Sequence, residues 1–140
     1  MLDICYPLGK GSKHSNMELR YSLRSIEKHL KGVGNVFIVG ERPDFLNDEI
    51  IHIQQPIVTG NAAQNIAMNL LAACKDERLS ETFLYMNDDV FFTSNLEAAN
   101  FLPYYKCNLS KTYQINTTDY RRHVKATMDT LTAQGHGTLN

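Results

Sequence analysis

Hydrophobic positions along the chain follow two different spacings. Short apolar runs that end in Gly, Pro, Asn or Asp predict strands, because those residues start turns. Four such runs occur in the first 92 residues, at 3–8, at 35–40, at 50–54 and from Phe83 onward. The last run stops abruptly at Asn87 and predicts a buried strand.

Apolar residues three or four positions apart predict helices between these strands. The two stripes are Leu19, Leu23, Ile26 and Leu30, and Ile66, Leu70 and Ala73. Residues 15–18 have the form of a capping box, and Asn61 with Gln64 offers a second capping pattern. A last helix is expected from Thr117 or Thr118 to Gln134. Its expected buried side is Tyr120, Val124, Met128 and Leu131.

The predicted elements over residues 1–92 run strand, helix, strand, short strand, helix, strand. This order predicts an α/β fold with a mostly parallel sheet, right-handed crossovers and helices on both faces. The 140 residues suit one domain, with a βαβ core over 1–92 and a loop plus C-terminal helix over 93–140. Because residues 138–140 look like the start of another strand, we expect the domain to be truncated at its C-terminus.

The amino-acid composition excludes only a few classes of protein and partner. With 43% hydrophobic and 21% charged residues, the chain can bury a core. A net charge of −1 creates no overall field that would attract nucleic acid. The chain shows no signal-peptide pattern and no apolar stretch near the roughly 18 residues of a membrane span. The three widely spaced cysteines, Cys5, Cys74 and Cys107, are typical of thiols in a reducing compartment. We therefore expect a cytoplasmic protein without a transmembrane segment or a nucleic-acid partner.

Two adjacent carboxylates, Asp88 and Asp89, follow the strand that begins at Phe83. Carboxylates at a buried strand end are costly unless a cation or hydrogen-bond donors offset their charge. Open α/β sheets bind ligands at this edge, and Mg²⁺ typically takes one or two carboxylates plus substrate phosphates. One hypothesis is therefore a metal-diphosphate site. The alternative is a strand that simply ends in turn-forming residues.

A Gly/Lys/Ser loop over residues 9–13 follows the first strand. Its glycines would let backbone N–H groups approach a phosphate, and Lys10 or Lys13 would add positive charge. The spacing is not that of a Walker A loop, and a solvated connection is the alternative. Because a helix links the first two strands, this loop is expected at the same sheet edge as Asp88 and Asp89.

Other polar residues have simpler interpretations. Arg20 and Arg24 share one helix face, for which a solvated surface is the alternative to a functional role. His52 lies between apolar neighbours and is expected to be a hydrogen-bonded structural histidine. The aromatic patch at 101–105 suits core packing or a lip over a ligand, and the basic cluster at 121–125 suits a solvated helix turn.

Three blocks of the chain strongly resemble the Stealth family. They are residues 18–29 (ELRYSLRSIEKH), 35–39 (NVFIV) and 83–91 (FLYMNDDVF). The family comprises bacterial capsular-polysaccharide phosphotransferases and relatives of the human lysosomal-enzyme GlcNAc-1-phosphotransferase. The likeness is greatest to its second conserved region and looks shared with small phage and bacterial glycosyltransferases.

The resemblance implies a nucleotide-diphospho-sugar transferase core of GT-A type. In such cores the first strand and its loop hold the nucleotide, and an acidic pair after the fourth strand handles metal and diphosphate. By position, Asp88 and Asp89 match that pair as metal ligands. The implied nucleotide-binding residues are Tyr6, Leu8, Gly9, Lys10, Gly11, Arg20, Arg24, Asn87 and Asp88. The implied catalytic residues are Arg20 and Asp89. Residues 6–11 depart from the family's tryptophan-containing first block, since this chain has no tryptophan.

The function hypothesis is a metal-dependent transferase. A Mn²⁺ or Mg²⁺ ion on Asp88 and/or Asp89 would neutralise the diphosphate of a nucleotide sugar, expected to be a UDP-sugar. Breaking the sugar C1–O bond would give a glycoside, whereas breaking the P–O–P bond would transfer a sugar-1-phosphate to a hydroxyl of a glycan or other acceptor. The residues do not decide between these reactions. The alternative is a truncated, non-catalytic remnant that still binds the nucleotide.

Overall fold

A computed structural model describes residues 1–10, 12–58, 60–101 and 118–136. The chain divides into two compact units, Met1–Phe101 and Leu102–Asn140. The predicted core over 1–92 lies within the first unit, and the prediction that residues 1–140 form one domain stays a prediction. In the second unit the structure describes helix α4, Thr118–Ala133, which confirms the expected last helix. Its Val124 is buried, and Met128 and Leu131 are half-buried.

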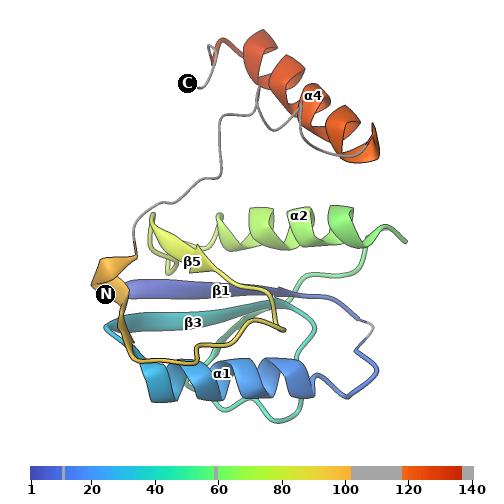
Figure 1. The fold of residues 1–140 in the computed structure, drawn as a ribbon. Helices are drawn as coiled ribbons and strands as arrows, with labels where there is room; N and C mark the ends of the chain where they lie inside the picture. Colours follow the sequence, from blue (N-terminus) through green and yellow to red (C-terminus); the bar gives the residue numbers. More distant parts are fainter. Residues whose placement is uncertain (11, 59, 102–117, 137–140) are drawn as a thin grey trace. The chain divides into compact units, whose positions relative to one another are not determined.

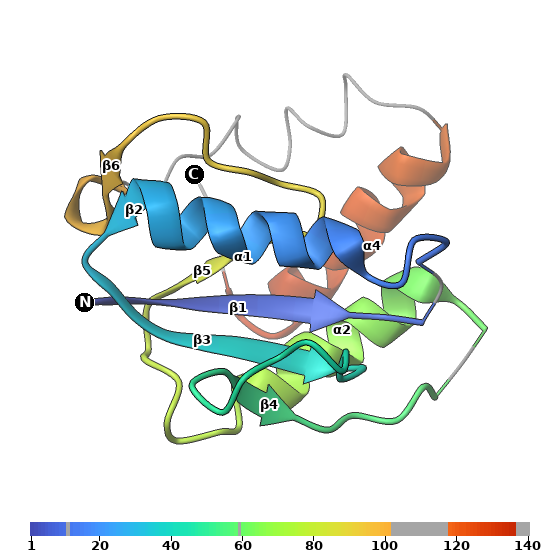
Figure 2. The ribbon, with the colours of Figure 1, turned by 90° about the horizontal axis from the view of Figure 1, so that it is seen from below.

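The first unit contains a four-stranded parallel sheet (Figure 1). Its strands are β1 (Leu2–Leu8), β3 (Val33–Gly40), β4 (Ile51–Ile53) and β5 (Phe83–Tyr85), in the order β4-β3-β1-β5. All three pairings are parallel, with β1 hydrogen-bonded to both β3 and β5. Two short strands, β2 (Leu30–Lys31) and β6 (Leu96–Glu97), form a separate parallel pair, seen from below in Figure 2. The predicted α/β class with a mostly parallel sheet is confirmed.

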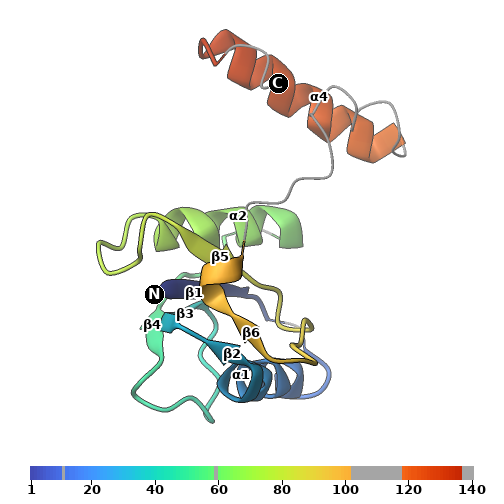
Figure 3. The same cartoon turned by 60° about the vertical axis from the view of Figure 1, so that its left-hand side comes forward.

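Helices cover both faces of the sheet, as predicted (Figures 1 and 3). Helix α1 (Met17–His29) lies on one face and α2 (Ala62–Ala73) on the other. Successive strand residues point to opposite faces, so alternate residues of β1 join different cores. Ile4, Tyr6 and Leu8 pack with Leu19 and Ile26 of α1. Cys5, Phe37 and Val39 pack with Ala73 of α2. No helix among the described residues is long and apolar enough to cross a bilayer.

Two local predictions need correction. The strand that begins at Phe83 was predicted to be buried, but it is a short edge strand. β5 has three residues, forms the edge of the sheet, and leaves Tyr85 42% exposed. An edge strand has a neighbour on one side only, which explains its exposure. The predicted capping box at 15–18 is also wrong, because the N-cap of α1 is Asn16 and makes no side-chain cap bond. Ser12 instead accepts the Asn16 N–H at 3.0 Å and donates to Glu18.

The cap predicted for α2 is confirmed, since Asn61 Oδ1 accepts a hydrogen bond from Gln64 N at 3.2 Å. The aromatic patch predicted at 101–105 lies outside the described residues except for Phe101. The ring of Phe101 packs edge-on against Phe92 at a centroid distance of 5.9 Å but is 36% exposed, so this residue is not part of the buried core.

Asp3 at the start of β1 joins three segments of the first unit. Its carboxylate is 3% exposed and accepts hydrogen bonds from Asn35 N at 2.7 Å and from the backbone N and Oγ of Ser80 at 2.9 and 2.7 Å. Burial alone would raise the pKa of Asp3, but the bonds from Ser80 and Asn35 outweigh it and lower the pKa below its ordinary value. Gly34 is required beside it, because a Cβ there would lie 2.3 Å from Asp3 Oδ1.

We expect Asp3→Asn to lower the free energy of unfolding by roughly 1.5–3 kcal/mol at neutral pH, since an NH₂ group would face a backbone donor. A carboxyl pKa that folding lowers contributes stability above its unfolded value, near 3.9, and this contribution is lost as pH falls through the folded pKa. The difference between wild type and variant should therefore be constant from pH 5 to 7 and shrink below about pH 4. Urea unfolding at several pH values measures it. A difference that grows on acidification would contradict this account.

Candidate functional site

A large cavity lies at the carboxyl ends of the sheet strands. From β1 the chain builds outward through β3 and β4 on one side, and β5 then adds on the other side. Ligands bind at such a reversal of strand order in open parallel sheets. The cavity there has a volume of about 1150 Å³, above the roughly 300–1000 Å³ of ordinary small-molecule sites. It therefore has room for a ligand of the size of a nucleotide sugar.

The acidic wall of this cavity is the turn that follows β5. Asn87, Asp88 and Asp89 all line the cavity, as the sequence predicted for this sheet edge. Met86 N donates to Cys5 O at 3.0 Å, which ties the start of the turn to β1. Burial raises the pKa of Asp88 above its ordinary value, and the nearby charges of Asp89 and Glu18 raise it further. A cation would therefore be favoured at this carboxylate.

Tyr85 sets the orientation of the Asn87 side chain. The Tyr85 hydroxyl donates to Asn87 Oδ1 at 2.7 Å. Burial raises the pKa of Tyr85, and the charges of Cys5 and Asp88 add to the shift, so the phenol keeps its proton at neutral pH. With its oxygen occupied, Asn87 has its amide NH₂ left as a donor. The arrangement suits a bond to an anionic oxygen better than a bond to a metal.

Two basic residues and a further acidic one also line the cavity. Gly9 and Lys10 follow β1, and Glu41 and Arg42 follow β3. Neither Lys10 nor Arg42 has an ion pair within the described part of the chain. Two basic side chains from neighbouring strand ends thus face the same cavity as the acidic turn. Such a charge arrangement fits a phosphate-bearing ligand accompanied by a cation.

The floor of the cavity contains residues that the sequence analysis did not single out for function. Asn69 of α2 is 5% exposed and donates from Nδ2 to Val39 O at 2.9 Å and Leu8 O at 3.3 Å, which joins the ends of β1 and β3. His52 Nε2 donates to Gly40 O at 2.9 Å, so this ring is hydrogen-bonded as predicted, although it also lines the cavity.

The sequence contains signals that point to Asn69 and to Arg42. Asn69 is a polar residue within the apolar stripe of its helix, and Arg42 is the second residue after a buried strand. Both patterns mark the edge of the sheet at which the acidic pair was expected. The segment after β4, residues 54–57, also lines the cavity but carries no chemical signature.

Several predicted site residues lie elsewhere. The Tyr6 side chain is fully buried beneath α1, its hydroxyl 2.7 Å from Ser22 Oγ, and burial raises its pKa to about 12. Leu8 does line the cavity at the end of β1, although its side chain is 2% exposed and packs in the core. Gly11 lies outside the described residues. Arg20 and Arg24 are not brought to the cavity of Asp88 and Asp89.

The two arginines instead line a second cavity of about 480 Å³ between α1, β3 and residues 45–50. There the Arg20 guanidinium lies 5.8 Å from the centroid of the Phe45 ring. The helix period explains this placement. Arg20 and Arg24 are each two residues from Ser22, or about 160° around the helix from it. Ser22 faces the segment that carries the acidic turn, so both arginines face away.

The donor atoms of the acidic pair limit the kind of cation that it could bind. The described residues contain no group of three or more His, Cys, Asp or Glu side chains that could hold a metal ion. A dedicated zinc-type cage is therefore not formed by these residues. Two carboxylate side chains beside a phosphate-sized space fit a Mg²⁺ or Mn²⁺ ion that takes its remaining ligands from substrate phosphates and water.

The chain is a parallel α/β protein with a cavity at the point where its strand order reverses, where open parallel sheets bind ligands. The chain belongs to the Stealth family: residues 12–110 match the model of Stealth protein CR2, conserved region 2. This match includes α1, β3 and the acidic turn, and it confirms the resemblance seen in the sequence.

Curated relatives include phosphotransferases. The chain is 38% identical over 105 residues to "N-acetylglucosamine-1-phosphotransferase subunits alpha/beta" of Mus musculus, which covers 65% of this chain and 8% of the relative. The protein of the same name from Homo sapiens is 37% identical over 105 residues, with the same shares. "Capsular polysaccharide phosphotransferase fcs1" of Haemophilus influenzae is 34% identical over 92 residues, covering 60% of this chain and 25% of the relative. The chain thus spans a small part of each relative.

Proposed function

We propose that this chain supplies the nucleotide-sugar site of a metal-dependent sugar-phosphate transferase. The observation that carries the proposal is one cavity lined by an acidic pair and by two basic residues, at the switch point of a parallel sheet. The names of the relatives add support, since both kinds are phosphotransferases. The proposed donor is a nucleotide-diphospho-sugar, expected to be a UDP-sugar. The proposed acceptor is a hydroxyl of a glycan or similar molecule.

Each wall has a defined task in this proposal. Asp88 and Asp89 would hold a Mn²⁺ or Mg²⁺ ion, which would neutralise the charge of the diphosphate. The amide NH₂ of Asn87 would donate to a phosphate oxygen, and Lys10 and Arg42 would offset part of the negative charge of the diphosphate. Gly9 leaves the backbone after β1 open to the ligand, because nothing lies within 4 Å of where its Cβ would be. The geometry does not support a direct contact from Arg20 or Arg24.

The phosphotransferase names favour cleavage of the P–O–P bond over the sugar C1–O bond. In that reaction a hydroxyl oxygen of the acceptor attacks the phosphorus of the sugar phosphate. A new P–O bond forms, the bond to the nucleoside monophosphate breaks, and the hydroxyl proton is released to water. The leaving group is then a nucleoside monophosphate, whereas glycosyl transfer would release a nucleoside diphosphate. Product analysis distinguishes the two.

Calorimetric titration of UDP, GDP and CDP, with Mn²⁺ or with EDTA, tests the site itself. We expect one of the three nucleotides to bind in the presence of Mn²⁺ and to bind much more weakly in EDTA, since the cation offsets the repulsion between diphosphate and carboxylates. Magnesium should substitute for manganese with the same nucleotide preference. The absence of binding by all three nucleotides would contradict the proposal.

A binding-only role is the second candidate, because the cavity residues described above account for metal and nucleotide binding alone. In that case the chain binds the metal and nucleotide but lacks the acceptor site. Incubation of a UDP-sugar with Mn²⁺ and a polysaccharide acceptor separates the candidates. Release of UMP supports the transferase, whereas tight nucleotide binding without release supports the binding-only role.

A further inference from the structure

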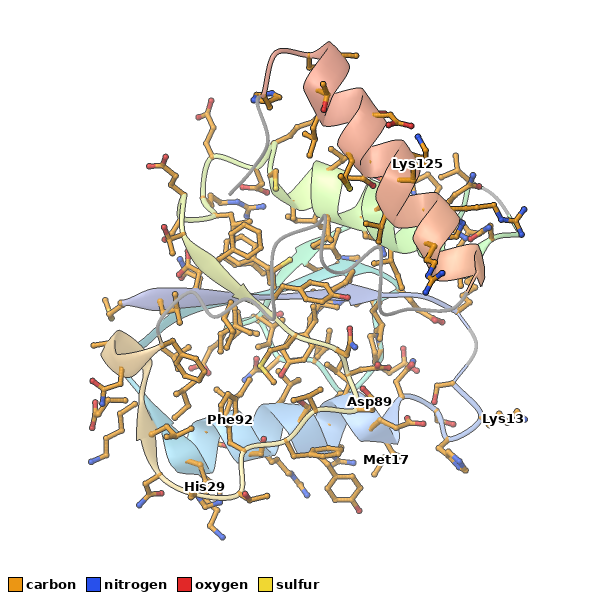
Figure 4. The ribbon with its side chains drawn as sticks, turned by 45° about the horizontal axis from the view of Figure 1, so that its top comes forward. Lys13, Met17, His29, Asp89, Phe92 and Lys125 are labelled. Atoms are coloured by element: carbon orange, nitrogen blue, oxygen red, sulfur yellow. The ribbon has the colours of Figure 1, made fainter. Side chains whose placement is uncertain are left out.

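The segment after β5 runs along α1 and is held by three side chains of that helix. Figure 4 shows Asp89 beside the first turn of α1, where Met17 lies, and Phe92 further along the helix towards His29. Ser22 Oγ donates to Val90 O at 2.5 Å, Ser25 Oγ accepts from Phe92 N at 3.0 Å, and His29 Nδ1 donates to Asn95 Oδ1 at 3.0 Å. The spacing i, i+3, i+7 places the three side chains on one stripe of the helix.

The two acidic residues are the central residues of a turn that ends at Val90. Val90 N donates to Asn87 O at 3.2 Å, which closes the turn around Asp88 and Asp89. Val90 O accepts from Ser22 Oγ. Both polar backbone groups of Val90 are therefore occupied, one by the turn and one by the helix. The Ser22 hydroxyl thus makes a hydrogen bond from α1 directly to the last residue of this turn.

Ser22 is itself tied to the centre of the sheet. It is fully buried, and its oxygen lies 2.7 Å from the hydroxyl of Tyr6 in β1. A hydroxyl has one proton, and that of Ser22 goes to Val90 O, so Tyr6 must be the donor in this pair. The Tyr6 hydroxyl has Met86 Sδ as a second, longer neighbour at 3.6 Å. The chain of contacts runs from the central strand through the helix to the acidic turn.

We propose that Ser22 is a positioning residue, whose hydroxyl sets the backbone at Val90 and thereby holds Asp88 and Asp89 in the orientation that binds the divalent cation and diphosphate. This inference rests on the function proposed above for the same cavity. Metal ligands depend on such outer contacts, whose loss typically lowers metal affinity 10–100-fold. Within the described residues, no other side chain hydrogen-bonds to either carboxylate, and the Asp88 carboxylate accepts from backbone N–H groups of the turn itself. The backbone of the turn is therefore what orients the two carboxylates.

The test compares Ser22→Ala with Ser25→Ala. Each variant loses one contact between α1 and the segment, but Ser25 contacts Phe92, which lies outside the acidic turn. UDP binding is titrated against Mn²⁺ concentration and repeated in EDTA, with thermal unfolding as a stability readout. For Ser22→Ala we expect the Mn²⁺ concentration at half-maximal binding to rise roughly tenfold, with binding in EDTA unchanged. For Ser25→Ala we expect less than about a twofold change.

Ser22→Cys separates the hydrogen bond from the space that the side chain fills. The thiol occupies the buried position but is a weak donor, so its shift should resemble that of Ser22→Ala. The inference would be overturned if the Mn²⁺ concentration at half-maximal binding shifted equally in Ser22→Ala and Ser25→Ala, or in neither Ser22 variant. Mn²⁺-dependent binding by the wild type would still support the proposed function in that case. If the wild type binds UDP, GDP and CDP neither with Mn²⁺ nor without it, the proposed function fails and the inference fails with it.

Discussion

Replacing Asp88 by Asn is expected to abolish Mn²⁺-dependent nucleotide binding without lowering the stability of the metal-free protein. The affinity should fall by at least about a hundredfold, because loss of outer contacts alone typically costs 10–100-fold and Asp88 is proposed as a direct ligand. Asn keeps the size of the side chain, so the cavity that Asp88 lines should keep its shape. Calorimetry with Mn²⁺ and the nucleotide that the wild type binds measures the loss.

The stability half of this prediction follows from the sign of the pKa shift. Folding raises the pKa of Asp88 through burial and through the charges of Asp89 and Glu18. A carboxyl with a raised folded pKa binds its proton more tightly in the folded state, so stability falls as pH rises through that pKa. Removing the charge should therefore leave the thermal midpoint in EDTA unchanged or slightly higher at pH 7.

Asp48→Asn is the matched control, since Asp48 is exposed and lines neither cavity. It should leave both nucleotide binding and the thermal midpoint unchanged. Asp89→Asn should lose binding as Asp88→Asn does, because the proposal gives both residues the same ion. Full Mn²⁺-dependent binding by either variant of the pair would remove that residue from the site. A large fall in thermal midpoint for Asp88→Asn would contradict the charge argument.

Replacing Gly40 by Ala is expected to destabilise the first unit more than any other single methyl addition at the cavity. Gly40 ends β3 with φ of +113°, a conformation that residues with a Cβ rarely adopt. A Cβ there would lie 2.2 Å from Leu8 O and 2.7 Å from Asn69 Nδ2. Backbone strain and overpacking together cost about 2–6 kcal/mol, which is a fall of roughly 10–30 °C in Tm for a unit of this size.

Gly9→Ala is the control for this experiment. Gly9 lines the same cavity, yet nothing lies within 4 Å of where its Cβ would be. Its substitution should leave stability unchanged or raise it by a few tenths of a kcal/mol, because the unfolded chain loses freedom. Urea unfolding of both variants gives the comparison. Similar unfolding free energies for Gly40→Ala and the wild type would show that the ends of β1 and β3 can separate without cost.

The sequence predicted one half of the cavity well. Parallel strands end at a common edge, so residues that follow β1 and β5 had to lie near one another, and Lys10 and Asp88 do line one cavity. The same rule applied to β3 leads to Arg42, the second residue after that strand. Asn69 could have been found as the polar position in an apolar helix stripe.

The placement of the arginines of α1 could not be predicted from the sequence. The helix carries Arg20 and Arg24 on one side and Ser22 and Ser25 on another, and either side suits a functional interpretation. Packing decided the matter, because the segment after β5 hydrogen-bonds to the serines and the Phe45 ring lies against Arg20. Both partners are distant in sequence, so no local pattern shows which side each will occupy.

By itself, the sequence determined the α/β class, the two sheet-covering helices and the acidic turn at the sheet edge. Those features depend on hydrophobic spacing and turn residues, which act over a few positions. The tertiary structure alone decided that β5 is a short edge strand and that Tyr6 supports Ser22 from within the core. It also placed Gly40 against Leu8 O. These features depend on contacts between segments 16 to 80 residues apart, whose geometry exists only once the sheet has assembled.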